Sequence, residues 1–387
     1  MAAAWTALGL VLGGLTCASA AYSLAAAALV RRFFQSETVP APGLPAVPPA
    51  VTILKPLSGD EPGLGAHLES FCRQDYPGDV QIVFGVQDPN DPAIRRVEAL
   101  QRDFPDRDLQ LVVSTREYGS NRKISNVVNI VREARHDVLV LADSDIGVRP
   151  SYVRDIVAAL SVPGIGLVTH LYRGEPLSGL WSHLSAMAID HHFLPSVIFG
   201  LATKRARPCF GTTIALRRSV LERAGGFGAF ADCLADDNAI GEAVRNLGLQ
   251  VAIPPMTVTH ACTERSLADL VAHELRWART IRSVDPVGFA GTIVTHPLPL
   301  GLMGAAAFGF SFAATAVLVL ALGCRLALLF QVDRSLGVQG RRWWLWPVRD
   351  VLSFIIFLAT FFVRSVTWKA RRFRVDSSGM LSSLKGQ

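Results

Sequence analysis

Two aspartates stand directly after an apolar run in residues 139–150, which read LVLADSDIGVRP. Asp143 and Asp145 are separated by one residue, and alternate side chains at the end of a strand point to the same side. Two carboxylates placed in this way can converge on a hard cation such as Mg²⁺ or Mn²⁺, which takes oxygen ligands and often borrows several from phosphate. We therefore interpret the pair as a metal clamp for a diphosphate group, with a solvated acidic turn as the alternative.

Two polar stretches upstream suggest contacts to the rest of a nucleotide. Asp88 and Asp91 follow the apolar run VFGV in a proline-bounded turn. Acids at strand ends can hold a nucleoside, although Asp, Asn and Pro also favour turns without any ligand. The stretch GSNRKISNVVN then opens a helix-like segment. Its N-terminal amides and Lys123 could face an anion, or the stretch could be a polar helix cap.

A second acidic pair, Asp236 and Asp237, stands just before an amphipathic segment. Acidic residues at a helix N-terminus are favoured by the helix dipole in any protein. The functional interpretation is a general base, a carboxylate that removes a proton from an attacking hydroxyl. Only one member of the pair need be catalytic.

The stretch HELRWARTIR places His273, Arg276 and Trp277 in a helix-like segment. A basic solvated face is the alternative here, and because HExxH is absent, zinc-protease chemistry is not indicated. In the functional interpretation, Arg276 stabilises a leaving diphosphate and Trp277 forms a stacking or packing wall.

The elements that must position these residues form an α/β pattern. Short apolar runs alternate with helix-like segments at 93–104 and 123–134; the runs cover residues 51–54, 80–86, 109–113, 138–142 and 166–169. This alternation predicts a mostly parallel central sheet covered on both faces. Ligands of such sheets bind at the carboxyl ends of the strands, which is where Asp143 and Asp145 fall.

The composition indicates a soluble domain joined to membrane spans, because half of the 387 residues are hydrophobic and only 18% are charged. Residues 1–30 are long and apolar enough for an N-terminal transmembrane anchor. Arg31 and Arg32 follow and place the next part of the chain on the cytoplasmic side. A cleaved signal peptide is the alternative.

The remaining boundaries follow from composition. Residues 31–50 form a linker rich in Pro and Ala, and 51–286 form the catalytic domain. Residues 287–368 form a membrane region with about two spans, and 369–387 a basic cytoplasmic tail. The net charge of +6 collects beside the apolar segments, so nucleic-acid binding is not predicted, and the six cysteines are expected to be free thiols.

Together the motifs resemble the processive-type and lipid-directed glycosyltransferases of families 2 and 21, whose pattern is D, DxD, D and (Q/R)xxRW on a GT-A fold. The resemblance covers about residues 51–285. It implies that Asp91 contacts the nucleotide, and that Asp143 and Asp145 hold the metal and the diphosphate of a UDP-sugar.

The resemblance also assigns the later motifs. It implies that Asp237 is the general base, that Asp236 beside it contacts the substrate, and that Arg276 and Trp277 are the RW of the last motif. His273 stands where the family has Gln or Arg, although a histidine can still donate to phosphate.

The resemblance implies an inverting transfer of sugar from a UDP-sugar to a lipid hydroxyl at the cytoplasmic face of a bacterial inner membrane. Stretches such as ILKPLSGDEPGL and ARPCFGTTIALRR are most similar to bacterial hopanoid-associated glycosyltransferases, which implies N-acetylglucosamine transfer to bacteriohopanetetrol. A ceramide glucosyltransferase using UDP-glucose is the alternative acceptor branch. A degenerate UDP-binding membrane scaffold is the non-enzyme alternative, and a processive polysaccharide synthase would need more spans. Residues 171–201 are the expected lipid-contacting region.

Overall fold

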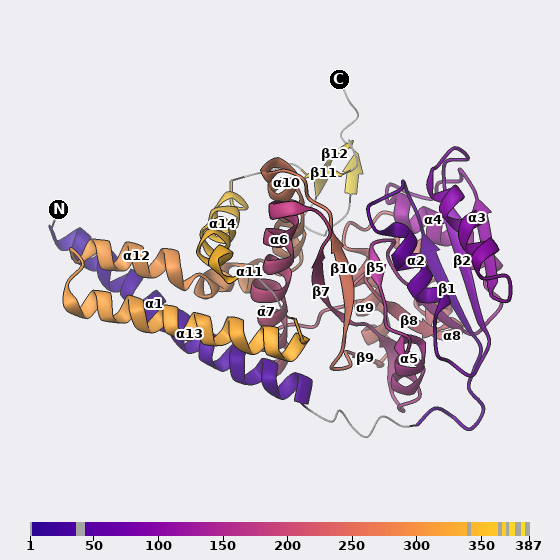
Figure 1. The fold of residues 1–387 in the computed structure, drawn as a ribbon, viewed down its shortest axis with the longest axis horizontal. Coiled ribbons are helices and arrows are strands. Elements are labelled where there is room, and N and C mark those ends of the chain that lie inside the picture. Colours follow the sequence, from indigo (N-terminus) through magenta and orange to yellow (C-terminus); the bar gives the residue numbers. More distant parts are fainter. Residues whose placement is uncertain are drawn as a thin grey trace. The chain divides into compact units, whose positions relative to one another are not determined.

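The computed structural model describes residues 2–35, 43–338, 342–362, 366–368, 371–375 and 381–383. The chain divides into two compact units, drawn as ribbons in Figure 1. An α/β unit comprises Glu37–Leu177, Pro208–Thr263 and Ser365–Gln387, and a helical unit comprises Met1–Ser36, Ser178–Arg207 and Glu264–Arg364. Two segments within residues 51–286 therefore cluster with the helices. Residues 36–42 of the predicted linker, and 369–370, 376–380 and 384–387 of the predicted tail, lie outside the described residues.

The α/β unit is built on a seven-stranded sheet in the order β3-β2-β1-β4-β8-β6-β9. Only β8 is antiparallel to its neighbours, and the other pairs are parallel. The apolar runs become strands because their side chains are buried, as in β1, where all six residues are buried. The strands are β1 (Val51–Pro56), β2 (Val80–Val86), β3 (Asp108–Val113), β4 (Val138–Leu141), β6 (Ile165–Val168), β8 (Ile214–Arg217) and β9 (Gln250–Ala252).

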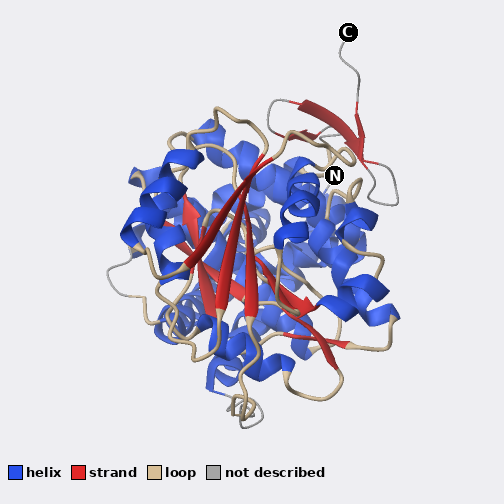
Figure 2. Ribbon diagram, turned by 90° about the vertical axis from the view of Figure 1, so that its right-hand side faces the viewer, coloured by secondary structure: helices blue, strands red, loops and turns tan. Residues whose placement is uncertain are grey.

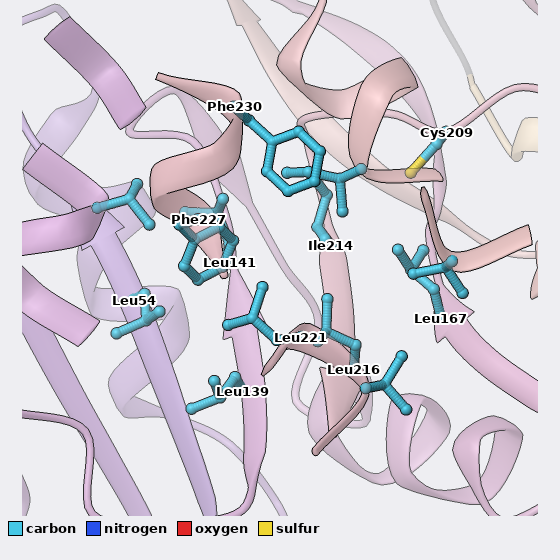
Figure 3. Close-up of a cluster of buried hydrophobic side chains, with 14 of the residues drawn as sticks. Leu54, Leu139, Leu141, Leu167, Cys209, Ile214, Leu216, Leu221, Phe227 and Phe230 are labelled. Carbon is cyan, nitrogen blue, oxygen red and sulfur yellow. The ribbon is translucent and has the colours of Figure 1, made fainter. Parts of the chain in front are cut away.

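Six helices among the described residues of the α/β unit accompany this sheet; Figure 2 draws helices in blue and strands in red. They are α2 (Leu64–Cys72), α3 (Ala93–Asp103), α4 (Arg122–Ile130), α5 (Tyr152–Leu160), α8 (Arg218–Arg223) and α9 (Asp236–Asn246). In the main core cluster, Leu54 of β1, Leu141 of β4 and Ile214 of β8 lie beside Phe227 and Phe230 (Figure 3). Each such side chain contributes about 1.5–3 kcal/mol on full burial, so this cluster fixes the strand ends from which the polar loops emerge.

A second sheet continues from the end of β4. It contains β5 (Ile146–Gly147), β10 (Thr257–Cys262) and β7 (Leu171–Pro176), with β10 in the middle. Ile146 pairs with His260, so the strand that follows Asp145 lies directly against β10. Three short antiparallel strands form a separate sheet: β11 (Val366–Trp368), at the end of the predicted membrane region, and β12 (Arg371–Val375) and β13 (Leu381–Ser383), in the predicted tail.

The helical unit gathers elements that are far apart in the sequence. Helix α1 (Ala2–Gln35) packs against α7 (Leu194–Ala202), α12 (Pro297–Ala307) and α13 (Phe312–Leu336). A continuous helical segment links α6 (Gly179–Ala188) to α7 through a π-helical turn, Ile189–Phe193. The unit also contains α10 (Leu267–Val284), α11 (Pro286–Gly291) and α14 (Trp346–Ala359).

Three helical segments among the described residues are long and apolar enough to cross a membrane: Trp5–Gln35, Gly179–Ala202 and Phe312–Leu336. Within the predicted membrane region 287–368, α13 is the segment of that length. Helices α12 and α14 have 11 and 14 residues, and at 1.5 Å per residue they reach about 17 and 21 Å, short of a hydrocarbon core of about 30 Å. The chain is therefore a membrane protein with three candidate spans.

Candidate active site

The Asp143–Asp145 loop is held from both sides. It leaves β4, which pairs with β1, and the Asp145 carbonyl accepts a hydrogen bond from the amide of Ala261 at 2.9 Å. The Asp145 carboxylate lies 3.2 Å from Nε2 of His260, measured from Oδ2. The buried ammonium of Lys55 donates to the Asp143 carbonyl. These contacts fix the loop before any ligand binds.

The pKa values of two buried basic side chains near this loop, Lys55 and His260, shift in opposite directions. Burial lowers the pKa of Lys55 to about 7, and the charges of Asp145 and Asp143 oppose that effect without overcoming it. Burial alone would also lower the pKa of His260, but the carboxylate of Asp145 outweighs it and raises this pKa well above the usual value. The imidazolium of His260 is therefore a counter-ion for Asp145.

Lys123 joins the first acidic pair to the second. Its Nζ lies 2.7 Å from Oδ1 of Asp143 and 3.4 Å from Oδ2 of Asp236. Burial opposes its charge, but the carboxylates of Asp143 and Asp236 together raise its pKa. The ammonium is thus permanently charged at the point where β4 ends and two helices begin.

Asn121 caps the N-terminus of α4, which agrees with the polar helix cap that the sequence left open for this stretch. The Asn121 side chain accepts from the amide of Ile124 at 3.1 Å and donates to Oδ1 of Asp236 at 3.1 Å and to the Cys233 carbonyl at 2.9 Å. One amide side chain therefore ties the start of α4 to the start of α9 and places Lys123 beside both acidic pairs.

Asp236 and Asp237 are the first two residues of α9, and their side chains have different surroundings. Asp236 is buried and faces Lys123 and Asn121. The carboxylate of Asp237 accepts from the amides of Gly211 at 3.0 Å and Asn238 at 2.7 Å. Burial, reinforced by the charge of Asp236, raises the pKa of Asp237 to about 6.

Gly211 marks the point on which the site converges. A Cβ at this position would lie 3.0 Å from both Oδ2 of Asp143 and Nζ of Lys123, and 3.7 Å from Oδ2 of Asp237. A side chain would therefore displace the first two groups. Asp143, Lys123 and Asp237, which the sequence placed in three separate motifs, surround one backbone position.

Asp91 occupies a neighbouring loop of the same unit. Both of its carboxylate oxygens accept from the amide of Gly59 at 3.0 Å, and Oδ1 also accepts from the amide of Ala93 at 2.9 Å. Gly59 has φ +82°, a conformation that glycine adopts without steric cost. Asp91 therefore ties the loop after β1 to the loop after β2 and starts α3.

The acidic pair after β4 fits a divalent cation by the chemistry of its donors. Asp143 and Asp145 offer carboxylate oxygens, the ligands that Mg²⁺ and Mn²⁺ prefer. No group of three or more His, Cys, Asp or Glu side chains is arranged as a complete metal site in the part of the chain that the structure describes. Mg²⁺ commonly binds through one or two carboxylates and takes its other ligands from substrate phosphates, so a cation here would need the diphosphate as well.

His273, Arg276 and Trp277 lie in α10 of the helical unit. Nδ1 of His273 is 2.6 Å from Oε1 of Glu264, and the rings of His273 and Trp277 meet edge to face with centroids 4.4 Å apart. Burial would raise the pKa of Glu264, but the hydrogen bond and charge of His273 outweigh it and lower this pKa. The Glu264 carboxylate thus holds His273 against Trp277.

Three residues of the site were missed by the sequence analysis: Lys55, His260 and Gly211. Lys55 interrupts the apolar run of β1, and a charged residue inside a buried strand is a signal that could have been used. His260 and Gly211 give no comparable signal, because their importance depends on which strands become neighbours. All six cysteines are free thiols, as predicted.

The fold itself is one known for sugar-nucleotide enzymes. The mannosyltransferase PcManGT from Pyrobaculum calidifontis, solved in complex with GDP-Man and Mn²⁺, is similar, with a TM-score of 0.54 and 21% sequence identity. The match covers 90% of this chain and 99% of that chain. This likeness confirms the predicted GT-A class of α/β fold.

The sequence comparisons give the family. The family model of Glycosyl transferase family 21 matches residues 14–381, and the chain belongs to this family. Ceramide glucosyltransferase 1 of Caenorhabditis elegans is 23% identical over 367 residues, which is 87% of this chain and 74% of the relative. Ceramide glucosyltransferase 3 of the same organism is 22% identical and covers 86% and 74%. The predicted enzyme class, glycosyltransferase, is confirmed.

Proposed function

We propose that this glycosyltransferase transfers a sugar from a UDP-sugar to a lipid hydroxyl with inversion at the anomeric carbon. The observation that carries the proposal is the convergence around Gly211 of the acidic residue Asp143, the ammonium of Lys123 and the carboxylate of Asp237. These three groups offer a cation ligand, a fixed positive charge and a proton acceptor around one backbone position.

The proposed reaction is a single displacement. Asp237 accepts the proton of the acceptor hydroxyl while its oxygen forms a bond to the anomeric carbon, and the bond from that carbon to the diphosphate breaks. A general base works best when its pKa lies near the working pH. The raised pKa of Asp237, about 6, keeps it mostly ionised at neutral pH and still basic enough to take a proton.

The leaving diphosphate carries negative charge that must be stabilised. We assign Mg²⁺ or Mn²⁺ to Asp143 and Asp145; when bound, it would neutralise part of this charge. Lys123, with its raised pKa, supplies a second positive group at the same place. Arg276 is proposed to bind the diphosphate through its guanidinium, whose planar donors suit phosphate oxygens.

The other predicted residues have supporting roles in the proposal. Asp91 fixes the loops after β1 and β2, where the nucleotide is proposed to bind. Asp236 holds Lys123 in place. Trp277 is proposed as a packing wall for the donor, and His273, which contacts its ring, as a donor to phosphate in place of the Gln or Arg of the family pattern.

We propose bacteriohopanetetrol as the acceptor and N-acetylglucosamine as the sugar, on the similarity of stretches such as ILKPLSGDEPGL to hopanoid-associated enzymes. The curated relatives are named ceramide glucosyltransferases, which supports UDP-glucose and ceramide as the second candidate pair. Arg31 and Arg32 directly follow the apolar part of α1, which supports a cytoplasmic face for the catalytic residues in a bacterial inner membrane.

The test is sugar transfer by the detergent-solubilised full chain. UDP-N-acetylglucosamine or UDP-glucose is supplied with bacteriohopanetetrol or with ceramide, with and without EDTA, and the lipids are analysed by mass spectrometry. A metal-dependent N-acetylhexosaminyl hopanoid is the expected product. Formation of glucosylceramide would support the same mechanism, with ceramide as the acceptor and glucose as the sugar. UDP binding without transfer to either lipid would contradict the proposed enzyme and favour the scaffold alternative.

A further inference from the structure

One charged residue interrupts the apolar face of α10. Leu270 and Ala278 of this helix belong to a hydrophobic cluster with residues of α6 and α14. Glu274 lies midway between them at helical spacing, so its carboxylate points into the same contact. A carboxylate placed there is costly unless it is paired and hydrogen-bonded.

The partner of this carboxylate is a fully buried arginine. Arg349 of α14 is 1% exposed, and its two terminal nitrogens lie 2.7 and 2.8 Å from the two oxygens of Glu274. Two further donors of the guanidinium go to the Leu184 carbonyl of α6 at 3.2 Å and to Oγ of Ser353 at 3.0 Å. The bidentate pair therefore joins three helices at a single point.

A second contact lies near the C-terminal end of α10. Nη1 of Arg282 donates to the Thr360 carbonyl at 2.7 Å, and the guanidinium lies 4.8 Å from the centre of the Phe361 ring. Arg276 and Trp277 lie between the two contacts along α10. The part of the helix that carries the RW residues is thus held on both sides, by Arg349 of α14 and by the turn that follows α14.

The neighbouring residue of α14 provides a built-in comparison. Asp350 is 1% exposed and pairs with Arg325 of α13 and His192 of the π-helical turn, at 2.8 Å in each case. This second buried pair fixes α14 to α13 and makes none of the described contacts to α10. Arg349 therefore connects α14 to α10 and α6, whereas Asp350 connects it to α13 and the π-helical turn.

We propose that Glu274 and Arg349 are positioning residues for sugar transfer: their buried ion pair sets the register of α10 on α14 and α6, and through it the placement of Arg276 and Trp277. The proposal rests on the proposed function for the part played by Arg276. A hydrophobic contact alone allows a helix to slide or rotate, whereas a bidentate pair has one geometry. Fixing register is the best-attested use of a buried polar pair.

The main variant is the double substitution Glu274→Met with Arg349→Met, which keeps apolar volume and leaves no buried charge. Replacing a buried ion pair by apolar residues is often neutral for stability, so the variant separates register from folding. We expect kcat to fall by about 10²-fold, the effect of a misplacement of about 1 Å. Donor KM is expected to rise as well, because Arg276 and Trp277 are proposed to contact the donor. Glu274→Gln, which keeps the side-chain shape, is the second variant, and Asp350→Asn is the matched control.

The distinguishing measurement is the coupling with Arg276. In the wild-type and Asp350→Asn backgrounds, Arg276→Ala should lower kcat by the same factor. In the Glu274→Met/Arg349→Met background, it should cost at least about tenfold less, because Arg276 is already misplaced. Equal factors in all three backgrounds, or a double-methionine variant with wild-type turnover, would overturn the proposal.

Hydrogen exchange of the purified protein gives a readout that needs no substrate. Amides of α10 should exchange at least about tenfold faster in Glu274→Gln than in wild type, and Asp350→Asn should leave them unchanged. Unchanged exchange in Glu274→Gln would refute the positioning role. If wild type transfers no sugar but the exchange difference appears, the proposed function fails while the register role of the pair stands.

Discussion

Replacement of Asp237 by Asn tests the proposed base most directly. The substitution keeps the size of the side chain and removes its ability to accept a proton. Loss of a single general base costs about 10²–10⁴-fold in rate, so kcat at neutral pH should fall by that factor. The oxygen of Asn can still accept one of the two backbone hydrogen bonds made by Asp237, those from Gly211 and Asn238.

The pH dependence follows from the surroundings of this carboxylate. Only the ionised form of Asp237 can accept a proton, so turnover should fall as the pH drops through its pKa of about 6. At about pH 5, roughly one tenth of a group with that pKa is ionised, and kcat should be about tenfold below its plateau. Because the charge of Asp236 contributes to raising this pKa, Asp236→Asn should move the midpoint to lower pH by up to about one unit.

The assay measures initial rates at saturating donor and acceptor between about pH 4.5 and pH 8.5. Wild type, Asp237→Asn and Asp236→Asn are compared, with thermal unfolding of each at every pH to confirm that the protein is folded. The residual turnover of Asp237→Asn should show no inflection at the midpoint of the wild-type profile. A flat wild-type profile between about pH 5 and pH 7, or turnover by Asp237→Asn within about threefold of wild type, would refute the assignment.

Further predictions concern the groups around Asp237. Gly211→Ala should lower kcat by about tenfold or more, because the new Cβ would lie 3.0 Å from both Oδ2 of Asp143 and Nζ of Lys123. The melting temperature should change little. Unchanged turnover would contradict the convergence of these groups on Gly211. Lys55→Met removes the donor to the Asp143 carbonyl and should lower transfer by about tenfold or more, measured beside wild type at equal folded fraction. EDTA should abolish transfer and added Mg²⁺ or Mn²⁺ should restore it, whereas activity that persists in EDTA would argue against a cation on Asp143 and Asp145.

The sequence was sufficient for the central sheet because its signals are local. Runs such as 51–54 and 80–86 are buried strands, and Asp143 follows a strand end as expected. The contacts of Lys55 with Asp143 and of His260 with Asp145 could not be predicted in this way. They depend on β1 pairing with β4 and on β10 pairing with β5, and pairings across long sequence separations leave no periodic trace.

The segment Gly179–Ala202 shows a second limit of sequence reasoning. Three polar residues, Asp190, His191 and His192, interrupt its apolar sequence. The segment falls inside the predicted catalytic domain, where it overlaps the expected lipid-contacting region 171–201. In the structure His191 lies 2.8 Å from Asp333, and His192 lies 2.8 Å from Asp350. These partners lie more than a hundred residues away in the sequence, so the pairing of polar residues that is common in membrane helices could not be predicted from the segment itself.

The scattered origin of the helical unit has a consequence for how the protein is made. Helix α1 ends at Gln35, and its main packing partner α13 begins at Phe312. At a synthesis rate of ~5–20 residues per second, α13 leaves the ribosome roughly 15 to 55 s after α1. The hydroxyls of Thr16, Ser19 and Ser23 donate to carbonyls of their own helix, so α1 satisfies them without a neighbour.

These three hydroxyls do not depend on a later part of the chain, whereas the Tyr22 hydroxyl of α1 lies 3.1 Å from Oγ of Ser196 in α7, a residue that is made much later. The α/β unit must meanwhile close its sheet with β8 and β9, which follow the α6–α7 segment in the chain. A candidate membrane span is therefore synthesised before the sheet of the α/β unit can be completed. Arg349 is made after α10, so α10 can be fixed by this residue only when α14 has been synthesised.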